Sequence, residues 1–120
     1  MITWEGLAEV NQLLPRRHLT HAELVERVAG YCVSLQLQAF YWPDSRKAIR
    51  KGWPDFAIGG PGGWLFREVK PAFARLSREQ RQTGYLMIAG GLNWAVWGEA
   101  DLESGTVLMQ LRTISAKRAV

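Results

Sequence analysis

Residues 52–70 read GWPDFAIGGPGGWLFREVK, and this stretch decides the fold. Two segments rich in apolar residues, Asp55–Gly59 and Trp64–Lys70, flank the turn Gly60–Gly63. A turn of glycine and proline between two such segments is typical of a β-hairpin. Pro71 cannot continue a central strand and would end the second one. The stretch therefore predicts two antiparallel strands joined by a tight turn.

The turn also predicts the register of the hairpin. If Pro61 and Gly62 lie at its tip, Asp55 faces Glu68 across the strands, with Cβ atoms about 5 Å apart. Lys70 shares the face of Glu68, because side chains alternate along a strand. Three charged groups then converge on one face. The other face carries Phe56, Ile58, Leu65 and Val69, with Arg67 at odds with full burial.

Three helices are predicted around the hairpin. They are residues 3–14, which stop before Pro15, a segment from Thr20 to about Cys32, and a segment from Ser77 to Gly90-Gly91. Thr20 and Ser77 are each followed three residues later by Glu23 or Gln80, which is the signature of a capping box. Apolar spacing predicts that the second helix buries Leu24, Val28 and Cys32.

Three further strands are predicted, at Leu35–Trp42, Asn93–Trp97 and Thr106–Arg112. The resulting order favours an α/β fold, with one mixed β-sheet flanked by helices. At 120 residues the chain fits a single domain, residues 1–120. We divide it into an N-terminal helical arm, 1–19, and a core of about 20–112.

Composition narrows the class of protein. A net charge of +4 and a pI near 9.6 favour a polyanionic partner. The single cysteine, Cys32, excludes an internal disulfide framework, suits a reducing cytosol and fits a buried apolar position better than a nucleophile. No signal peptide and no membrane-spanning stretch is apparent, so we expect a cytoplasmic protein without a membrane partner.

The facing carboxylates Asp55 and Glu68 favour a metal site. Like charges opposite one another destabilise a sheet unless something neutralises them. Mg²⁺ or Mn²⁺ would do so, since these ions take carboxylate oxygens together with water and phosphate. Lys70 could orient an attacking water or offset charge on a phosphate. Glu-x-Lys is also common as a surface ion pair, which is the competing interpretation.

Three segments together resemble the PD-(D/E)xK nucleases: Gly52-Trp-Pro-Asp55, Glu68-Val-Lys70 and Leu76-Ser-Arg-Glu-Gln80. The match is closest to the small phage-encoded VRR-NUC type, which is related to Holliday junction resolvases, and covers about Thr20 to Trp97. The resemblance implies a restriction-endonuclease-like core, Mg²⁺ or Mn²⁺ dependence, phosphodiester hydrolysis and often a homodimer.

Specific roles follow from the same resemblance. Asp55, Glu68 and the backbone carbonyl of Val69 would ligate the metal, and Lys70 would be the catalytic lysine. Gln80 matches a glutamine near the active centre of these nucleases, although the capping box offers it a structural role.

The resemblance leaves the third metal ligand open. These nucleases carry a glutamate on the opening helix, followed by apolar residues three and seven positions later. His21 meets this spacing and Glu23 does not, so His21 occupies the acidic position. Glu23, or Glu26, remains a competing ligand if the alignment shifts by one turn.

Four cations precede the Pro-Asp pair and would contact DNA phosphates: Arg46, Lys47, Arg50 and Lys51. A merely solvated loop is the alternative. Trp42 and Trp53 bracket this loop and could stack on a base or pack in the core. Trp94 and Trp97 should face opposite sides of their strand, one in the core and one available for an interface.

The expected function is therefore a metal-dependent endonuclease acting on DNA. It would be structure-selective, for branched, junction or flap substrates, in phage-type replication, recombination or packaging, and would work in the host cytosol. The alternatives are a DNA-binding module that keeps the fold with weak catalysis, and an accessory protein that pairs through its tryptophans. Residues 1–19 could serve as a dimerisation arm.

Overall fold

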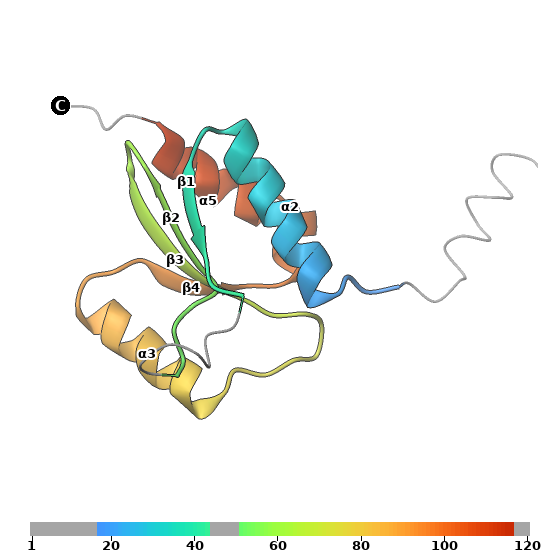
Figure 1. The fold of residues 1–120 in the computed structure, drawn as a ribbon, viewed down its shortest axis with the longest axis vertical. Coiled ribbons are helices and arrows are strands. Elements are labelled where there is room, and N and C mark those ends of the chain that lie inside the picture. Colours follow the sequence, from blue (N-terminus) through green and yellow to red (C-terminus); the bar gives the residue numbers. More distant parts are fainter. Residues whose placement is uncertain (1–16, 44–50, 117–120) are drawn as a thin grey trace, which may run out of the picture.

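The computed structural model describes residues 17–43 and 51–116 (Figure 1). It has a mixed α/β fold in which a four-stranded sheet is flanked by helices. The elements are α2 (His21–Ser34), β1 (Gln38–Tyr41), β2 (Phe56–Gly60), β3 (Gly63–Val69), α3 (Arg78–Ala89), β4 (Trp94–Trp97), α4 (Glu99–Glu103) and α5 (Thr106–Ser115). The predicted helix at 3–14 lies outside the described residues.

The sheet has the order β1-β2-β3-β4. Strands β1, β2 and β3 are antiparallel neighbours, whereas β4 runs parallel to β3 after the crossover through α3. Gly60 pairs with Gly63 and Phe56 pairs with Arg67, which is the register predicted from the turn. The strands reach further into the turn than expected, so that only Pro61 and Gly62 form the loop.

Both predicted capping boxes are present. In α2 the Thr20 hydroxyl accepts from the Glu23 N–H, and the Glu23 carboxylate accepts from the Thr20 N–H. Ser77 and Gln80 form the same pair at α3, which ends at Gly90 as expected. Each box satisfies two backbone N–H groups at a helix start, where the chain itself offers no acceptor.

The predicted strand at Thr106–Arg112 is wrong. This segment belongs to α5, and the short helix α4 before it was not predicted. The spacing of Val107, Leu111 and Ile114, which are all buried, is helical rather than alternating. Gly105, with φ of 83°, separates the two helices in a conformation that favours glycine.

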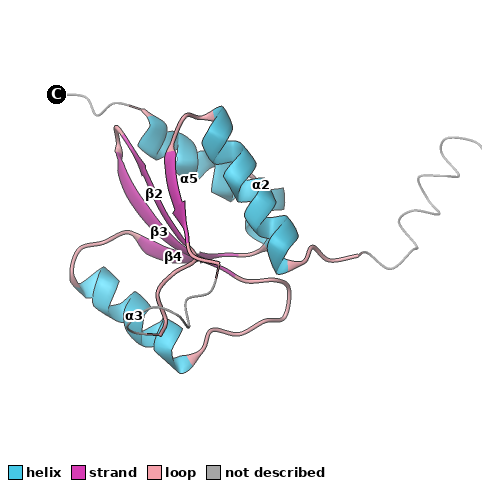
Figure 2. Ribbon diagram, in the orientation of Figure 1, coloured by secondary structure: helices cyan, strands magenta, loops and turns pink. Residues whose placement is uncertain are grey.

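Helices α2 and α5 cover one face of the sheet, and α3 lies on the other side beside β4 (Figure 2). The covered face holds the apolar side of the hairpin, as predicted. Its core residues are Leu24, Val28, Cys32, Phe56, Ile58, Leu65, Val69, Trp97, Val107, Leu111 and Ile114. The tip of the hairpin is tied to α5, because the Gly62 N–H donates to the Ile114 carbonyl at 2.8 Å.

The two tryptophans of β4 point to opposite sides, as expected. Trp97 is buried in the core, whereas Trp94 packs against α3. A Cβ at Gly84 would lie 2.7 Å from the Trp94 ring, so the missing side chain lets α3 approach β4 closely. Within residues 17–43 and 51–116, no helix is both long and apolar enough to cross a bilayer.

Arg67 is the polar exception on the covered face, with 2% of its surface exposed. Its guanidinium donates to the Asn93 carbonyl at 2.7 Å, to the Phe66 carbonyl at 2.9 Å and to Gln110 Oε1 at 3.1 Å. It also lies 5.1 Å from the centre of the Trp97 ring. Burial lowers the pKa of Arg67 to about 10, which still leaves it charged at neutral pH. Neutral oxygens and an aromatic face thus compensate for the lost hydration.

We expect Arg67→Ala to lower the free energy of unfolding by about 3 kcal/mol, because it removes the hydrogen bonds of the guanidinium and leaves a cavity where the buried side chain packs on Trp97. Chemical denaturation monitored by circular dichroism measures this change. Arg112→Ala, at an exposed position on α5, is the matched control and should cost under about 0.5 kcal/mol. Equal losses in the two variants would contradict this account of Arg67.

Candidate functional site

Asp55 directly precedes β2, and its side chain accepts a hydrogen bond that a backbone carbonyl of the paired strand would otherwise accept. In the register of the hairpin, Pro54 would face Val69 and accept its N–H. The Asp55 carboxylate accepts that N–H instead, with Oδ2 at 2.8 Å. The Asp55 carbonyl in turn accepts the Trp42 N–H at 3.0 Å. Both neighbouring strands therefore hold Asp55, and its carboxylate lies at the base of the hairpin.

Glu68 lies beside Asp55, as the register predicted, and is 2% exposed. Its Oε2 atom is buried and has no hydrogen-bond partner among the described residues. Burial raises the pKa of Glu68 well above its usual range, and the adjacent carboxyl group of Asp55 raises it further. Lys70 lowers the same pKa, but less. Two carboxyl groups thus lie side by side, and one lysine does not neutralise both.

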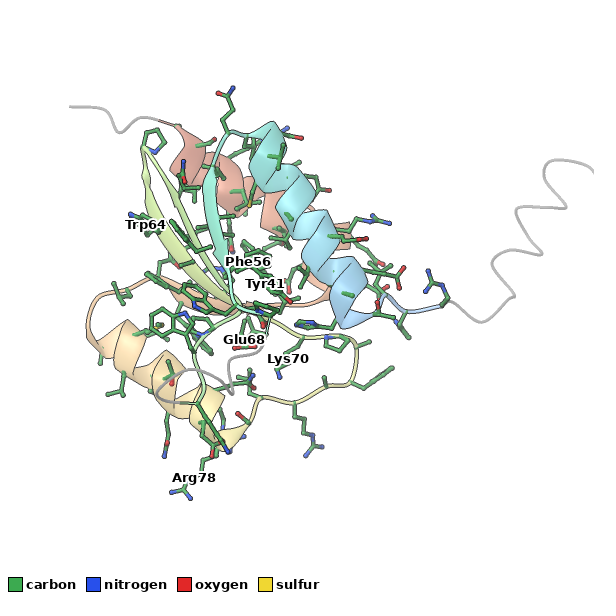
Figure 3. All side chains as sticks on the ribbon, in the orientation of Figure 1. Tyr41, Phe56, Trp64, Glu68, Lys70 and Arg78 are labelled. Atoms are coloured by element: carbon green, nitrogen blue, oxygen red, sulfur yellow. The ribbon has the colours of Figure 1, made fainter. Side chains whose placement is uncertain are left out.

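Lys70 follows the last residue of β3, and Figure 3 shows Glu68 and Lys70 next to one another at this end of the sheet. Its N–H donates to the Trp97 carbonyl at 2.9 Å, which fixes the backbone. The side chain lines a hollow of about 340 Å³, together with Lys51, Arg75 and Gln80. The predicted lysine is therefore close enough to Glu68 for its charge to act on that carboxyl group, and it also lines a hollow in which cations outnumber acids.

The structure explains why the Gly-Trp-Pro-Asp segment begins with glycine. Gly52 has φ of 97°, and a Cβ there would lie 2.4 Å from the Glu79 carbonyl oxygen. The chain that enters β2 therefore passes directly against the first turn of α3, which only glycine allows. This contact brings Lys51 and the start of α3 to the same hollow.

The structure brings His21 to the carboxyl pair and leaves Glu23 outside it. His21 Nε2 lies 3.4 Å from Asp55 Oδ2, a long and weak contact. The carboxylate of Glu23 instead accepts from both terminal nitrogens of Arg17 at 2.9 Å and from the Thr20 N–H at 3.1 Å. The hydrogen bond to Arg17 is the main reason why the pKa of Glu23 falls to about 2. The competing ligand is thus engaged elsewhere.

Gln80 has the structural role that the capping box predicted. Its Oε1 accepts the Ser77 N–H at 2.8 Å, while its own N–H donates to Ser77 Oγ at 3.1 Å. The residue also lines the basic hollow, so the structural and the functional role are compatible.

Of the predicted cationic loop, Arg46, Lys47 and Arg50 lie outside the described residues. Lys51 is exposed on the rim of the hollow. Trp42 and Trp53 meet edge to face with ring centres 5.4 Å apart, so they pack on each other. Cys32 is buried, and burial raises the pKa of its thiol to about 11, as expected of an inert core cysteine.

Two residues near the site were not singled out from the sequence. Arg75 lines the basic hollow, and Tyr41 is close enough to Asp55 for the carboxylate charge to raise its pKa, after the larger effect of burial. Tyr41 lies at the end of β1, beside the start of β2 where Asp55 stands. A strand pairing predicted for β1 would have found it, whereas Arg75 follows an irregular segment without a periodic pattern.

A metal ion would be only partly ligated by side chains here. In the described part of the chain, no three His, Cys, Asp or Glu side chains are grouped so as to hold one ion. The donors on hand are the two carboxyl groups, backbone carbonyls and the imidazole of His21, which lies 3.4 Å from Asp55. Mg²⁺ commonly binds through one or two carboxylates and completes its shell with water and phosphate oxygens. The unpartnered buried oxygen of Glu68 fits such an ion.

The raised pKa of Glu68 predicts how stability depends on pH in metal-free protein. A carboxyl group with a higher pKa in the folded state than the unfolded value of about 4.3 stabilises the fold at low pH, and this contribution is lost as the pH rises through the folded pKa. Thermal midpoints in EDTA should therefore fall more steeply with rising pH for the unmodified protein than for Glu68→Gln. Parallel curves would mean that the carboxyl is not buried as a neutral group.

Comparison with protein-family models, with curated proteins and with solved structures finds no match to this chain. The candidate site therefore rests on its own geometry: two adjacent carboxyl groups, one of them buried, beside a lysine and a basic hollow.

Proposed function

We propose that the chain is a metal-dependent endonuclease of the PD-(D/E)xK type, with a restriction-endonuclease-like core, that hydrolyses DNA phosphodiester bonds. The observation that carries this proposal is the pair Asp55 and Glu68 at the base of the hairpin, with a buried Glu68 oxygen that has no partner. A buried acid beside a second acid is costly to the fold. A cation that both acids bind would offset that cost.

Asp55, Glu68 and the carbonyl of Val69 would hold Mg²⁺ or Mn²⁺, and His21 is the nearest candidate for a further ligand. An imidazole suits Mn²⁺ better than Mg²⁺, so we expect Mn²⁺ to be preferred. When bound, such an ion polarises the phosphoryl oxygen and makes a bound water more acidic.

The chain's own residues supply the remaining functions. Lys70 lies beside the acids, where its ammonium group orients the attacking water and offsets charge that develops on the phosphate. Lys51 and Arg75 face the same hollow and hold the neighbouring phosphates of the strand. Gln80 lines the hollow and contributes its amide group. The net charge of +4 favours the approach of a polyanion.

The biological setting belongs to the same proposal. Branched, junction or flap DNA is the expected substrate, in phage-type replication, recombination or packaging within the host cytosol. A homodimer would place two sites on a two-fold symmetric junction, which one small site cannot cut on both strands at once.

Purified protein should cleave branched or flapped DNA with Mn²⁺ or Mg²⁺. Asp55→Ala and Lys70→Ala should each lower the cleavage rate by at least about a hundredfold, since they remove a metal ligand and the charge beside it. Gel assays of labelled substrates measure the rate, and circular dichroism checks the fold. Arg112→Ala should cleave at the unmodified rate. Undiminished cleavage by both site variants would refute the assignment.

Metal binding can be measured without any cleavage. A ligand that binds only the folded state raises its stability, by about 2.7 kcal/mol at a hundredfold excess over Kd. Mn²⁺ should therefore raise the thermal midpoint of the unmodified protein but not that of Asp55→Asn. EDTA should reverse the increase. An equal increase in both proteins would exclude Asp55 as a ligand.

A second candidate is a DNA-binding module with weak catalysis. It is favoured by one observation: a histidine, rather than a third carboxylate, faces Asp55. This candidate predicts DNA affinity that does not change with metal and no increase in the thermal midpoint with Mn²⁺.

A further inference from the structure

The face of the sheet opposite α2 and α5 carries a pair of exposed aromatic rings. Phe40 of β1 and Trp64 of β3 are each 50% exposed. Their rings stack with centres 6.1 Å apart and planes inclined by 25°. In Figure 3, Trp64 projects from the hairpin on the side away from α2. We name Phe40 and Trp64 the aromatic platform.

Gly59 makes the platform flat. It pairs with Trp64 across the hairpin, and a Cβ at Gly59 would lie 2.6 Å from the indole ring. The ring therefore lies directly on the backbone of β2, with its outer surface toward solvent. Glycine is rare inside strands and often marks such a close approach. Half-exposed aromatics on a flat sheet face, held rigid from below, present a surface for another flat ring.

The platform and the carboxyl site share this face of β3. Trp64, Phe66 and Glu68 alternate with the core residues, so all three belong to the same side. Trp64 and Glu68 are four residues apart, which corresponds to about 13 Å along a strand. Phe66 lies between them and meets Trp53 edge to face at 6.4 Å. An aromatic path therefore leads from the platform to the acids.

Positive charge gathers at the acidic end of this path. The hollow that Lys70 lines holds three cations, Lys51, Lys70 and Arg75, and one acid, Glu79, whereas the platform itself carries only aromatic rings. Proteins that bind unpaired nucleic acid combine these two features, since cations hold the phosphates and aromatic rings stack on the bases. Paired bases in a duplex keep their faces covered. The arrangement therefore fits an unpaired strand better than a continuous duplex.

We propose that Phe40 and Trp64 form a stacking platform for unpaired bases on one side of the phosphate that is cut. The substrate then carries a single-stranded flap or branch at this position. At a rise of 3.4 Å per stacked nucleotide, the path spans about four nucleotides. This inference rests on the proposed nuclease function, whose site it extends.

The test measures binding of a short oligothymidylate to the full chain in EDTA, so that no strand is cut. An oligonucleotide of the same length made of abasic residues keeps the phosphates and lacks the bases. Fluorescence anisotropy gives both affinities for the unmodified protein, Trp64→Ala, Phe40→Ala and Met109→Ala. Met109 is 62% exposed on α5, on the other side of the sheet, and serves as the control.

The unmodified protein should bind oligothymidylate about tenfold more tightly than the abasic strand. Trp64→Ala and Phe40→Ala should lose most of this difference and bind the abasic strand as before, while Met109→Ala keeps it. Gly59→Ala, which displaces the indole without removing it, should give an intermediate loss. Phe40 lies on an edge strand, so its variant still decides the outcome if Trp64→Ala does not fold.

Equal affinity of the unmodified protein for both strands would overturn the platform. The platform would also be overturned if the variants lost affinity for oligothymidylate and for the abasic oligonucleotide by the same factor. If Trp64→Ala dissociated a dimer and left the oligonucleotide affinity unchanged, the face would be an interface between two copies. If cleavage depends on Asp55 but any of these results is also obtained, the nuclease proposal holds and the platform proposal fails. If binding depends on the bases but no metal-dependent cleavage is found, the platform proposal holds and the nuclease proposal is refuted.

Discussion

The register of the β2–β3 hairpin is the constraint on which the rest of the structure depends. A two-residue turn at Pro61 and Gly62 fixes which residues face each other, and a shift by one residue would exchange the two faces. In the observed register one face supplies Phe56, Ile58 and Leu65 to the core. The other face carries Trp64 and Glu68. Core and candidate site are thus two consequences of one pairing.

The same constraint explains why the acids are close together at a cost to stability. Asp55 is held from both sides, by the Val69 N–H at its carboxylate and by the Trp42 N–H at its carbonyl. Glu68 cannot move away, because it lies in the middle of the sheet between β2 and β4. Its carboxyl group is therefore buried next to a second acid. A structure that only needed to be stable would place an apolar side chain here, so strain of this kind points to a function.

Local signals in the sequence were sufficient for the hairpin, both capping boxes and the buried positions of α2. Each of these depends on residues that lie close together in the sequence, and the pairing of Asp55 with Glu68 follows from the turn between them. The prediction was wrong for the segment after Trp97. Thr106–Arg112 is short and rich in apolar residues, and its helical spacing is clear only when Ile114 is included. Arg67 was anticipated as an exception, but its burial depends on Asn93 and Gln110, which lie far along the chain. The position of Arg75 beside Lys70 depends on an irregular segment in the same way.

The contact between Gly62 and Ile114 joins residues that are far apart in the sequence. The hairpin can form locally, whereas closing the chain between its tip and α5 is slow, since distant contacts cost more entropy to bring together. We therefore expect β2 to pair with β3 before α5 covers the hairpin. Until α5 docks, Ile58 and Leu65 would face water. The glycine-rich turn has to specify the pairing without help from the core, and a substitution there would affect the speed and fidelity of folding as well as the final stability.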